Sequence, residues 1–302
     1  MPTETPPVAQ PAKTSAGSPP ASVDVAISVR GLRKSYGDNE AVAGVDLDIF
    51  RGEIFALLGP NGAGKTVTVE ILEGYRRRDA GDVSVLGVDP AKADAHWKSQ
   101  IGIVLQSQGG DSELTVAETV RVQAAYFANP RPVEEVIALV GLTQKLKAKA
   151  SSLSGGQQRR LDVALGIVGR PRLLFLDEPT TGFDPEARRQ FWELIRQLRE
   201  LGTTMLLTTH YLDEAEALAD RVGVIAAGSI VEIGVPAELG GRHLAPARVR
   251  WVEDGQHREE TTATPTAVVQ ALSQRLGGEI PELAVQRPSL EDIYLQMIGE
   301  PA

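Results

Sequence analysis

Short apolar runs alternate with amphipathic segments between residue 25 and about residue 240. Three of these runs, at 54–58, 173–176 and 205–207, each end in a polar cluster, as buried parallel strands do. The segments between them have helical periodicity, so the pattern predicts an α/β domain in which helices cover the faces of a sheet. Ligands bind at the carboxyl ends of the strands in such sheets. The polar residues that follow the three strands should therefore meet at one site.

Helix signals alone occupy residues from about 107 to 170, which predicts a helical insert in the sheet domain. Thr115 and Glu118 have the spacing of a capping box, and the helix that they open should end near Asn129 and Pro130. We expect the whole domain, with its insert, to cover residues 25–240.

The composition changes on both sides of this domain. After residue 240, apolar alternation at 247–252 predicts a strand, and 265–276 and 289–298 have helical patterns, so 241–302 should form a small α+β appendage. Residues 1–24 contain six prolines among small residues. Such a segment buries too little apolar surface to offset the entropy of ordering, and we expect a disordered tail.

The formal net charge of −9 disfavours broad binding to nucleic acid, which requires clustered Lys and Arg, and direct adsorption to an anionic membrane. The run Arg76-Arg77-Arg78 is a local exception, either a solvated loop or a contact with an acidic partner. No apolar run approaches the about 18 residues that cross a bilayer. The first residues lack the apolar core of a signal peptide, and there is no cysteine. We therefore expect a cytoplasmic protein that would need a protein partner to act at a membrane.

Residues 59–66 read Gly-Pro-Asn-Gly-Ala-Gly-Lys-Thr and lie between a predicted strand and a predicted helix, the context of a P-loop. The glycines allow backbone N–H groups to surround phosphate oxygens. Lys65 can reach the β- and γ-phosphates, and the Thr66 hydroxyl can bind Mg²⁺. A glycine-rich turn with a chance lysine is the alternative. The motif predicts a site for ATP and Mg²⁺.

A second polar cluster, Asp177-Glu178, follows the predicted strand at 173–176. Asp177 can join the second shell of the Mg²⁺ held by Thr66. Glu178 points elsewhere, and a carboxylate beside the γ-phosphate could orient and deprotonate a water, so Glu178 is the candidate general base. A solvated loop acid is the alternative reading of Glu178.

The pentapeptide Leu-Ser-Gly-Gly-Gln at 153–157 opens another predicted helix, with Ser154 and Gln157 as a capping box. Gly155 and Gly156 in its first turn each cost about 1 kcal/mol relative to Ala, but they leave the helix N–H groups open to an anion. An ordinary helix start explains the segment alone equally well. One nucleotide needs one phosphate cradle, so a chain with two such elements indicates that ATP binds between two copies.

The P-loop, the sequence Leu-Asp-Glu-Pro at 176–179 and the pentapeptide at 153–157 together resemble the nucleotide-binding subunits of ATP-binding cassette (ABC) transporters over about residues 27–240. The resemblance implies a P-loop NTPase sheet domain and a head-to-tail dimer, formed by two copies or with a second ABC subunit. In that dimer the P-loop of one subunit and residues Ser154, Gly155, Gly156 and Gln157 of the other enclose each ATP. It also implies a multispanning permease that holds the chain at the inner face of the cell membrane.

The same resemblance gives roles to residues that the pattern leaves unassigned. Tyr36 matches an aromatic that stacks on adenine, with Ala41 nearby, although a strand-edge tyrosine is the alternative. Gln106 matches a glutamine that reaches Mg²⁺ and water and links to the membrane subunit, unless it is a plain loop residue. His210 matches a histidine that contacts the γ-phosphate, and Asp184, an expected helix N-cap, matches an aspartate at the dimer interface.

The resemblance implies a complete site for ATP and Mg²⁺. The ATP-binding residues are Tyr36, Ala41, Gly59, Pro60, Asn61, Gly62, Ala63, Gly64, Lys65, Thr66 and Val67. The catalytic residues are Lys65, Gln106, Glu178 and His210, and the metal-binding residues are Thr66, Gln106 and Asp177. Two positions depart from the family pattern. Val67 replaces a hydroxyl that touches the α-phosphate, which predicts slightly weaker nucleotide binding, and Phe183 replaces a leucine, which predicts altered dimer packing.

Segments 208–221, 234–239 and 288–295 are similar to the drug- and antibiotic-resistance branch of ABC exporter ATPases. We therefore expect an ATPase that powers efflux of a drug, an antibiotic or another amphipathic compound through a separate permease. An importer subunit is one alternative, and a soluble ABC-type ATP switch is another. Such switches usually carry two cassettes in one chain, long coiled coils or cysteine-bound zinc, and the sequence shows none of these features.

Overall fold

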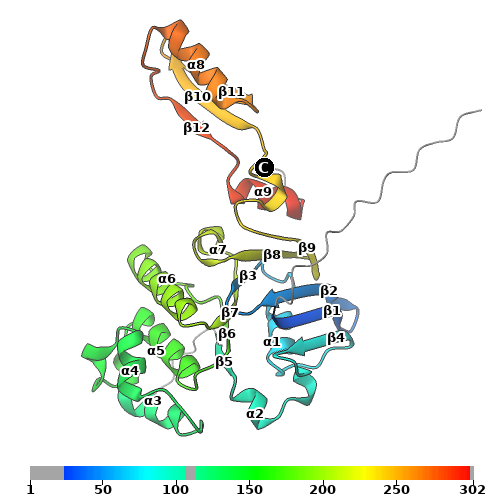
Figure 1. Ribbon diagram of the computed structural model, residues 1–302, viewed down its shortest axis with the longest axis vertical. Helices are drawn as coiled ribbons and strands as arrows, with labels where there is room; N and C mark the ends of the chain where they lie inside the picture. Colours follow the sequence, from blue (N-terminus) through cyan, green and yellow to red (C-terminus); the bar gives the residue numbers. More distant parts are fainter. Residues whose placement is uncertain (1–23, 106–112, 300–302) are drawn as a thin grey trace, which may run out of the picture.

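The computed structural model describes residues 24–105 and 113–299. The predicted tail, apart from Asp24, and Gln106 lie outside the described residues. A cassette of two sheets, with most of its helices on one side, forms the lower part of Figure 1, and a smaller α+β unit projects from one end of it. Within the described parts of the chain, no helix is long and apolar enough to cross a membrane.

The main sheet has six strands in the order β5-β6-β7-β3-β8-β9, parallel except for the last pair. Its strands are β3 (Ile54–Leu58), β5 (Ile101–Val104), β6 (Leu173–Asp177), β7 (Thr204–Thr209), β8 (Arg221–Ala226) and β9 (Ser229–Gly234). The three strands predicted from apolar runs are β3, β6 and β7. Every residue of β3 and β7 is buried, as expected for strands with helices or a second sheet on both faces. This arrangement confirms the α/β prediction.

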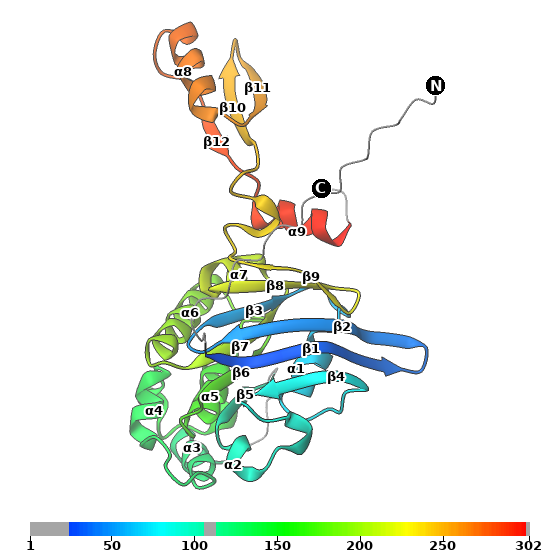
Figure 2. The same ribbon diagram turned by 45° about the vertical axis from the view of Figure 1, so that its right-hand side comes forward.

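A second, antiparallel sheet in the order β2-β1-β4 packs against the main sheet and was not predicted. Its strands are β1 (Val25–Tyr36), β2 (Asn39–Phe50) and β4 (Ala80–Val85). Their buried apolar side chains share one core with α1 (Lys65–Leu72) and with Phe55 and Leu206 of the main sheet. Figure 2 shows the two sheets as adjacent layers. The short helices η1 (Pro90–Lys92) and α2 (Ala95–Lys98) lead from β4 to β5.

The predicted helical insert lies between β5 and β6, beside the other face of the main sheet. It contains α3 (Val116–Ala124), α4 (Val133–Leu139), η2 (Thr143–Lys145), η3 (Ala150–Ser152) and α5 (Gly155–Ile167). The predicted capping boxes at the starts of α3 and α5 are both present. Helices α6 (Pro185–Glu200) and α7 (Leu212–Leu218) complete this side of the core.

Helix α3 ends at Ala124, earlier than the predicted stop near Asn129. The amides of Tyr126 and Phe127 donate to carbonyls three residues back, which tightens the last turn and ends the helix. Phe127 then lies against Gly169: a Cβ on that glycine would be 2.3 Å from the Phe127 ring. The prediction failed because this contact between distant residues, rather than the next proline, decides where the chain leaves the helix.

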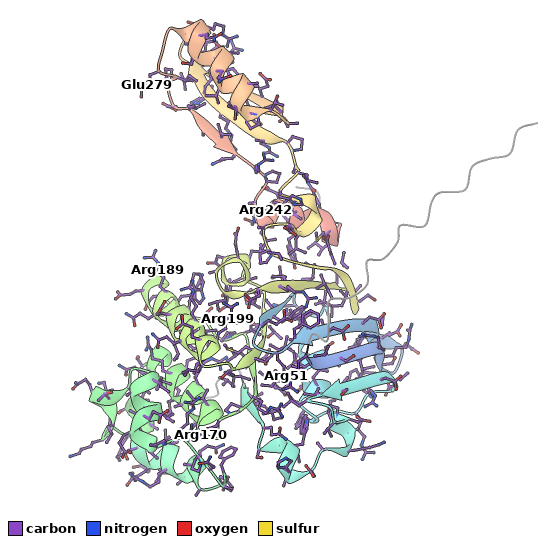
Figure 3. The ribbon with its side chains drawn as sticks, in the orientation of Figure 1. Arg51, Arg170, Arg189, Arg199, Arg242 and Glu279 are labelled. Carbon is purple, nitrogen blue, oxygen red and sulfur yellow. The ribbon has the colours of Figure 1, made fainter. Side chains whose placement is uncertain are left out.

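The C-terminal stretch divides into two parts. The projecting unit consists of the sheet β11-β10-β12 and one helix, α8 (Pro265–Leu276), with β10 (Ala247–Glu253), β11 (Gln256–Thr262) and β12 (Ala284–Gln286). The last helix, α9 (Leu290–Ile298), instead returns to the cassette near η4 (Leu239–Gly241) and buries Leu290 in the main core. Arg242, labelled in Figure 3, lies where the chain leaves the cassette for the projecting unit. Its guanidinium donates to the carbonyl oxygen of Pro288, on the returning segment, and pairs with Glu216 of α7.

Candidate functional site

The loop between β3 and α1 has the backbone form that the P-loop motif predicts. Gly64, at the N-cap of α1, has a φ of 102°, and a Cβ there would lie 2.4 Å from the Ala41 carbonyl oxygen. Only glycine can therefore occupy this position without displacing the backbone. The first-turn N–H groups of α1 have no acceptor within the helix and point toward the loop, which favours an anion there.

Lys65 is almost fully buried, and its ammonium group lies inside this loop. It donates to the carbonyl oxygens of Gly59, at 2.7 Å, and Pro60, at 3.2 Å, and its Nζ is 3.9 Å from Oε1 of Glu178. Burial lowers the pKa of Lys65, while the nearby carboxylates of Glu178 and Asp177 act in the opposite direction. The charge is thus held at the loop by backbone dipoles and carboxylates, in a place where a phosphate could pair with it.

A cavity of about 300 Å³ opens beside this loop. Its lining residues come from three separate segments: Tyr36, Asn39 and Ala41; Asn61, Gly62, Gly64, Lys65, Thr66 and Val67; and Glu178. The fold therefore brings most of the predicted nucleotide residues to one cavity. Gly59, Pro60 and Ala63 belong to the loop itself, and Gln106 lies outside the described residues.

The arginine run of 76–78 turns out to bind within its own chain at two of its three positions. Arg76 pairs with Glu70 and donates to the Tyr36 hydroxyl at 2.8 Å, which fixes the exposed Tyr36 ring at the mouth of the cavity. Arg78 makes two bonds to Asp89 and holds the pKa of that carboxyl at about 2. Most of the local positive charge is therefore neutralised inside the cassette.

Asp177 and Glu178 emerge at the carboxyl edge of the main sheet and are held by Thr208 of the neighbouring strand. The Thr208 hydroxyl donates to Asp177 Oδ1 at 2.6 Å and accepts the Glu178 N–H at 3.0 Å. Asp177 and Thr208 are register partners in β6 and β7, so strand pairing alone places them together. The sequence analysis assigned no role to Thr208. Its position at the end of an apolar strand, beside the strand that ends in Asp177, could have indicated one.

Glu178 lies between two cationic or ionisable groups. Its Oε1 is 3.9 Å from Lys65 Nζ and 3.3 Å from His210 Nδ1, and its other oxygen accepts from the Thr181 hydroxyl at 3.4 Å. Its φ of 42° is unusual for a residue with a side chain, and such backbone strain concentrates at functional sites. The side chain is thereby turned toward the P-loop cavity rather than along the strand.

Arg159 is a second residue that sequence reasoning missed. Its guanidinium is buried on α5 and donates to three carbonyl oxygens: those of Leu105, Asp177 (2.6 Å) and Pro179 (3.0 Å). Burial lowers its pKa, opposed by carboxylates that include Asp177. Arg159 precedes Val163 and Ile167 on the buried face of α5. A charged residue on an apolar helix face is the signal that could have revealed it.

The segment at the N-terminus of α5 lies outside the cavity. Ser154 and Gln157 close the capping box through the bonds Ser154 N–H to Gln157 Oε1 and Gln157 N–H to Ser154 Oγ. Ser154 and Gly155 are exposed, and Gly156 and Gln157 are half-buried. Asp184 caps α6 nearby, accepting the N–H groups of Glu186 and Ala187. Neither element contributes to the cavity of its own chain.

Comparisons with known proteins support the resemblance. Residues 42–181 match the family model described as ABC transporter. Over 307 residues the chain is 35% identical to the daunorubicin resistance ATP-binding protein DrrA3 of Streptomyces coeruleorubidus, covering 92% of this chain and 97% of that protein. Over 301 residues it is 40% identical to the Nod factor export ATP-binding protein I of Ralstonia nicotianae, covering 90% of this chain and 94% of that protein.

Solved structures agree with this fold. A nucleotide-free ATP-binding cassette from an ABC transporter superposes with a TM-score of 0.63 at 22% identity, covering 70% of this chain and 91% of that one. An ATP-binding subunit of an ABC transporter gives 0.64 at 25% identity with the same coverage. The similarity spans nearly the whole length of both sequence relatives, and the chain belongs to the ATP-binding, ATP-hydrolysing subunits of ABC transporters.

Proposed function

We propose that this chain is the ATPase of an exporter, in which two subunits enclose ATP between them and drive a separate permease that expels a drug, an antibiotic or another amphipathic compound. The observation that carries the proposal is the division of the site. Lys65 and Glu178 line one cavity and His210 Nδ1 lies 3.3 Å from Glu178 Oε1, whereas the exposed start of α5 at Ser154 lies outside the cavity. The direction of transport is supported by the relatives named above for resistance and export.

In the proposed reaction the first turn of α1 and Lys65 bind the phosphates, and Tyr36 supports the adenine. Glu178 accepts a proton from the attacking water, and His210, whose Nδ1 is 3.3 Å from Glu178 Oε1 and has no hydrogen-bond partner among the described residues, contacts the γ-phosphate. Strand pairing and Thr208 fix the backbone of Glu178, so its carboxylate is placed before ATP arrives.

The donor set fits Mg²⁺. The Thr66 side chain is exposed at the cavity, and Asp177 supplies a carboxylate oxygen at the same sheet edge. Mg²⁺ typically takes one or two protein oxygens and completes its shell with phosphates and water. We assign Thr66, Asp177 and Gln106 to it, and the bound ion would neutralise charge that develops on the phosphates.

The opposite wall of each ATP site comes, in this proposal, from the second subunit. The glycines at the start of α5 leave that helix end open, so its unpaired N–H groups can approach the γ-phosphate of the partner's ATP. Asp184, at the exposed start of α6, lies at the same dimer surface. ATP would then close the dimer, and hydrolysis would remove the shared charge and reopen it.

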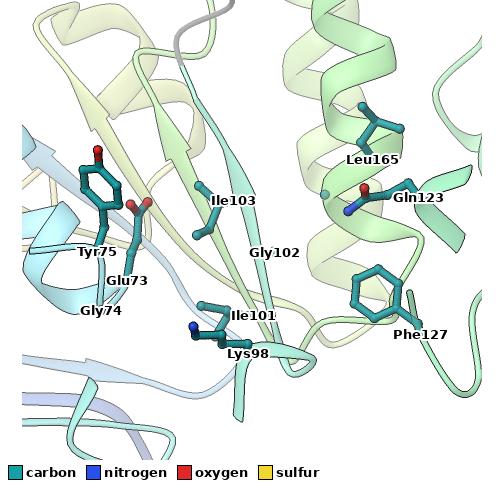
Figure 4. A pocket seen from close by; sticks show the side chains of 11 residues that line it. Glu73, Gly74, Tyr75, Lys98, Ile101, Gly102, Ile103, Gln123, Phe127 and Leu165 are labelled. Atoms are coloured by element: carbon teal, nitrogen blue, oxygen red, sulfur yellow. The ribbon is translucent and has the colours of Figure 1, made fainter. Parts of the chain in front are cut away.

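A groove between the main sheet and the helical insert is the proposed contact for the permease. It has a volume of about 550 Å³ and is lined by Glu73, Tyr75, Ile103, Gln123, Phe127 and Leu165, as Figure 4 shows. Tyr75, in this lining, and Leu105, which directly follows β5, are exposed apolar side chains. Leu105 also accepts a bond from Arg159, which reaches Asp177. A cytoplasmic helix of the permease seated here would therefore contact a strand tied to the catalytic edge.

Glu73 gives this groove its electrostatic character. The residue is buried at the end of α1, and burial, assisted by the negative charges of Asp177 and Glu70, raises its pKa to about 8. Lys98 also lines the groove, but Glu73 forms no ion pair with it. A basic side chain from the permease helix would lower this pKa, so that Glu73 becomes a carboxylate, pairs with the added charge and completes the groove.

Replacement of Glu178 by Gln should leave ATP binding intact and reduce ATP turnover at least about 100-fold, because the amide cannot accept the proton of water. The trapped ATP should also hold the dimer together. Turnover by purified protein measures the loss of hydrolysis, and the ATP that remains bound after gel filtration with Mg²⁺ measures the trapping, with Glu282→Gln in the projecting unit as a control. Wild-type turnover in Glu178→Gln would show that the base is another group.

The two-subunit site can be tested by mixing inactive chains. Ser154→Arg should block hydrolysis because the added side chain occupies the partner's phosphate position, and Lys65→Ala should disable its own P-loop. A heterodimer of the two variants retains one complete site, so turnover should return to about half of the wild-type rate per dimer. If a heterodimer that is demonstrably assembled shows no turnover, the shared site is contradicted.

Glu73 predicts a pH dependence of stability with a definite sign. Its pKa is raised by folding, so the folded chain retains a proton that the unfolded chain loses, and the wild type loses stability as pH rises from about 4.5 to about 8. Glu73→Gln should therefore become more stable than the wild type across this range, by about 2–4 kcal/mol in total. Urea unfolding at several pH values measures the difference. The exposed Glu200→Gln is the control, and a pH-independent difference for Glu73→Gln would contradict the assignment.

A further inference from the structure

The projecting unit has one long, unpaired sheet edge. Its strand order is β11-β10-β12, so β11 (Gln256–Thr262) lies at the edge, and its residues are exposed except for the half-buried Thr262. The opposite edge, β12, has only three residues. Short edge strands resist pairing with other chains, whereas a long edge offers a row of backbone donors and acceptors to a further strand. In the described residues, β11 pairs with no strand other than β10.

The hairpin turn determines which groups β11 offers. Asp254 and Gly255 both have positive φ, 53° and 73°, as in a type I′ two-residue turn, and Glu253 and Gln256 are register partners that close it. Hydrogen-bonded pairs then alternate along the two strands from Gln256. The even-numbered residues of β11 therefore bond to β10, while the N–H and C=O groups of His257, Glu259 and Thr261 point outward.

An open groove accompanies this edge on the face that α8 covers. It measures about 350 Å³ and is lined by Trp251 and Glu260 of the sheet and by Ala267, Val268, Ala271 and Arg275 of α8. Helix α8 packs on β10, where Val249 and Trp251 are buried, and leaves the side chains of β11 exposed. A further strand beside β11 would place its own side chains at this groove.

The charges on β11 match those of a second copy of the same strand. A two-fold axis perpendicular to the sheet places residues of the same face opposite each other. With the axis at Glu259, His257 lies opposite Thr261 of the partner, and Arg258 lies opposite the partner's Glu260 on the groove side. Each outward backbone group then meets an outward group, and each Arg258 meets a Glu260. Axes at the adjacent positions, 258 or 260, would instead oppose two arginines or two glutamates on the groove side.

We propose that β11 pairs antiparallel with β11 of a second copy about an axis at Glu259, so that the two projecting units form one continuous sheet. Arg258–Glu260 pairs form twice, in non-hydrogen-bonded positions where side chains approach most closely. On the other face the two Glu259 carboxylates meet. Each already pairs with Arg250 of its own chain, whose Nε lies 3.1 Å from Glu259 Oε2. This contact is independent of nucleotide and would hold two copies together while their cassettes separate.

Sedimentation equilibrium of the full chain without nucleotide tests the proposal. The wild type should be a dimer, and Arg258→Glu should raise the dimer dissociation constant about tenfold or more, because like charges then face each other twice. The double change Arg258→Glu with Glu260→Arg should restore dimerisation. A mixture of Arg258→Glu and Glu260→Arg should form a heterodimer that neither variant forms alone. Glu279→Arg, an exposed site away from β11 (Figure 3), is the control and should change nothing.

The register can be tested separately because the chain has no cysteine. Glu259→Cys places one thiol at the axis, where Cα atoms of a hydrogen-bonded pair are about 5.5 Å apart, so oxidation should link two chains. Thr261→Cys lies opposite His257 and should not link to its own copy. A monomeric wild type, unchanged affinity in Arg258→Glu, or equal cross-linking of both cysteine variants would overturn the inference. None of these results would affect the proposed ATPase activity, because that activity is tested by substitutions in the cassette and not in the projecting unit.

Discussion

Three carbonyl oxygens at the carboxyl edge of the main sheet share one donor group, the buried guanidinium of Arg159. The acceptors belong to Leu105, Asp177 and Pro179, so a single side chain of α5 fixes the end of β5 and both sides of Glu178. A buried guanidinium is unfavourable unless its donors are satisfied, and a buried carbonyl is unfavourable without a donor. Removal of the guanidinium would therefore leave the three carbonyl oxygens without this donor, and displacement of the carbonyls would leave the guanidinium N–H groups unpaired. The position of Glu178 depends on this constraint.

The same contact connects parts of the molecule that act in different places. Ser154, which we assign to the partner's ATP, caps the start of α5, and the same helix carries Arg159, which holds the catalytic edge of its own chain. Leu105 directly follows β5, whose residue Ile103 lines the groove proposed for the permease. Movement of a permease helix in that groove would thus reach β5, α5 and the loop at Asp177 through one guanidinium. Coupling between the two ATP sites and the membrane partner can follow from this shared contact, because all three elements must move together or break its bonds.

The sequence predicted the parts of this protein that local patterns encode. Buried strands such as β3, the capping boxes of α3 and α5, and the P-loop with Lys65 follow from short-range periodicity and from residue types at fixed spacing. The antiparallel sheet of β1, β2 and β4 was missed although β1 and β2 form a local hairpin, because β4 joins β1 from beyond the P-loop and α1, as in the pair of Ile27 with Val85, and one face of β1 is largely solvated. Arg159 and Thr208 were missed for a related reason: their partners are backbone atoms of distant strands, which no local pattern marks. The roles of Tyr36, His210 and Gln106 came from family resemblance rather than from the residues themselves.

We infer that Arg159 holds the catalytic edge in a geometry that hydrolysis requires. The most direct measurement is kcat for Arg159→Lys, since a single amine cannot donate to three carbonyls in the guanidinium's positions. Arg160→Lys is the matched control, because Arg160 lies on the same helix but donates to Val140 and Gln190. We predict that Arg159→Lys binds ATP as the wild type does and loses about 10- to 100-fold in kcat, while Arg160→Lys retains its kcat. A folded Arg159→Lys protein with wild-type kcat would contradict the account.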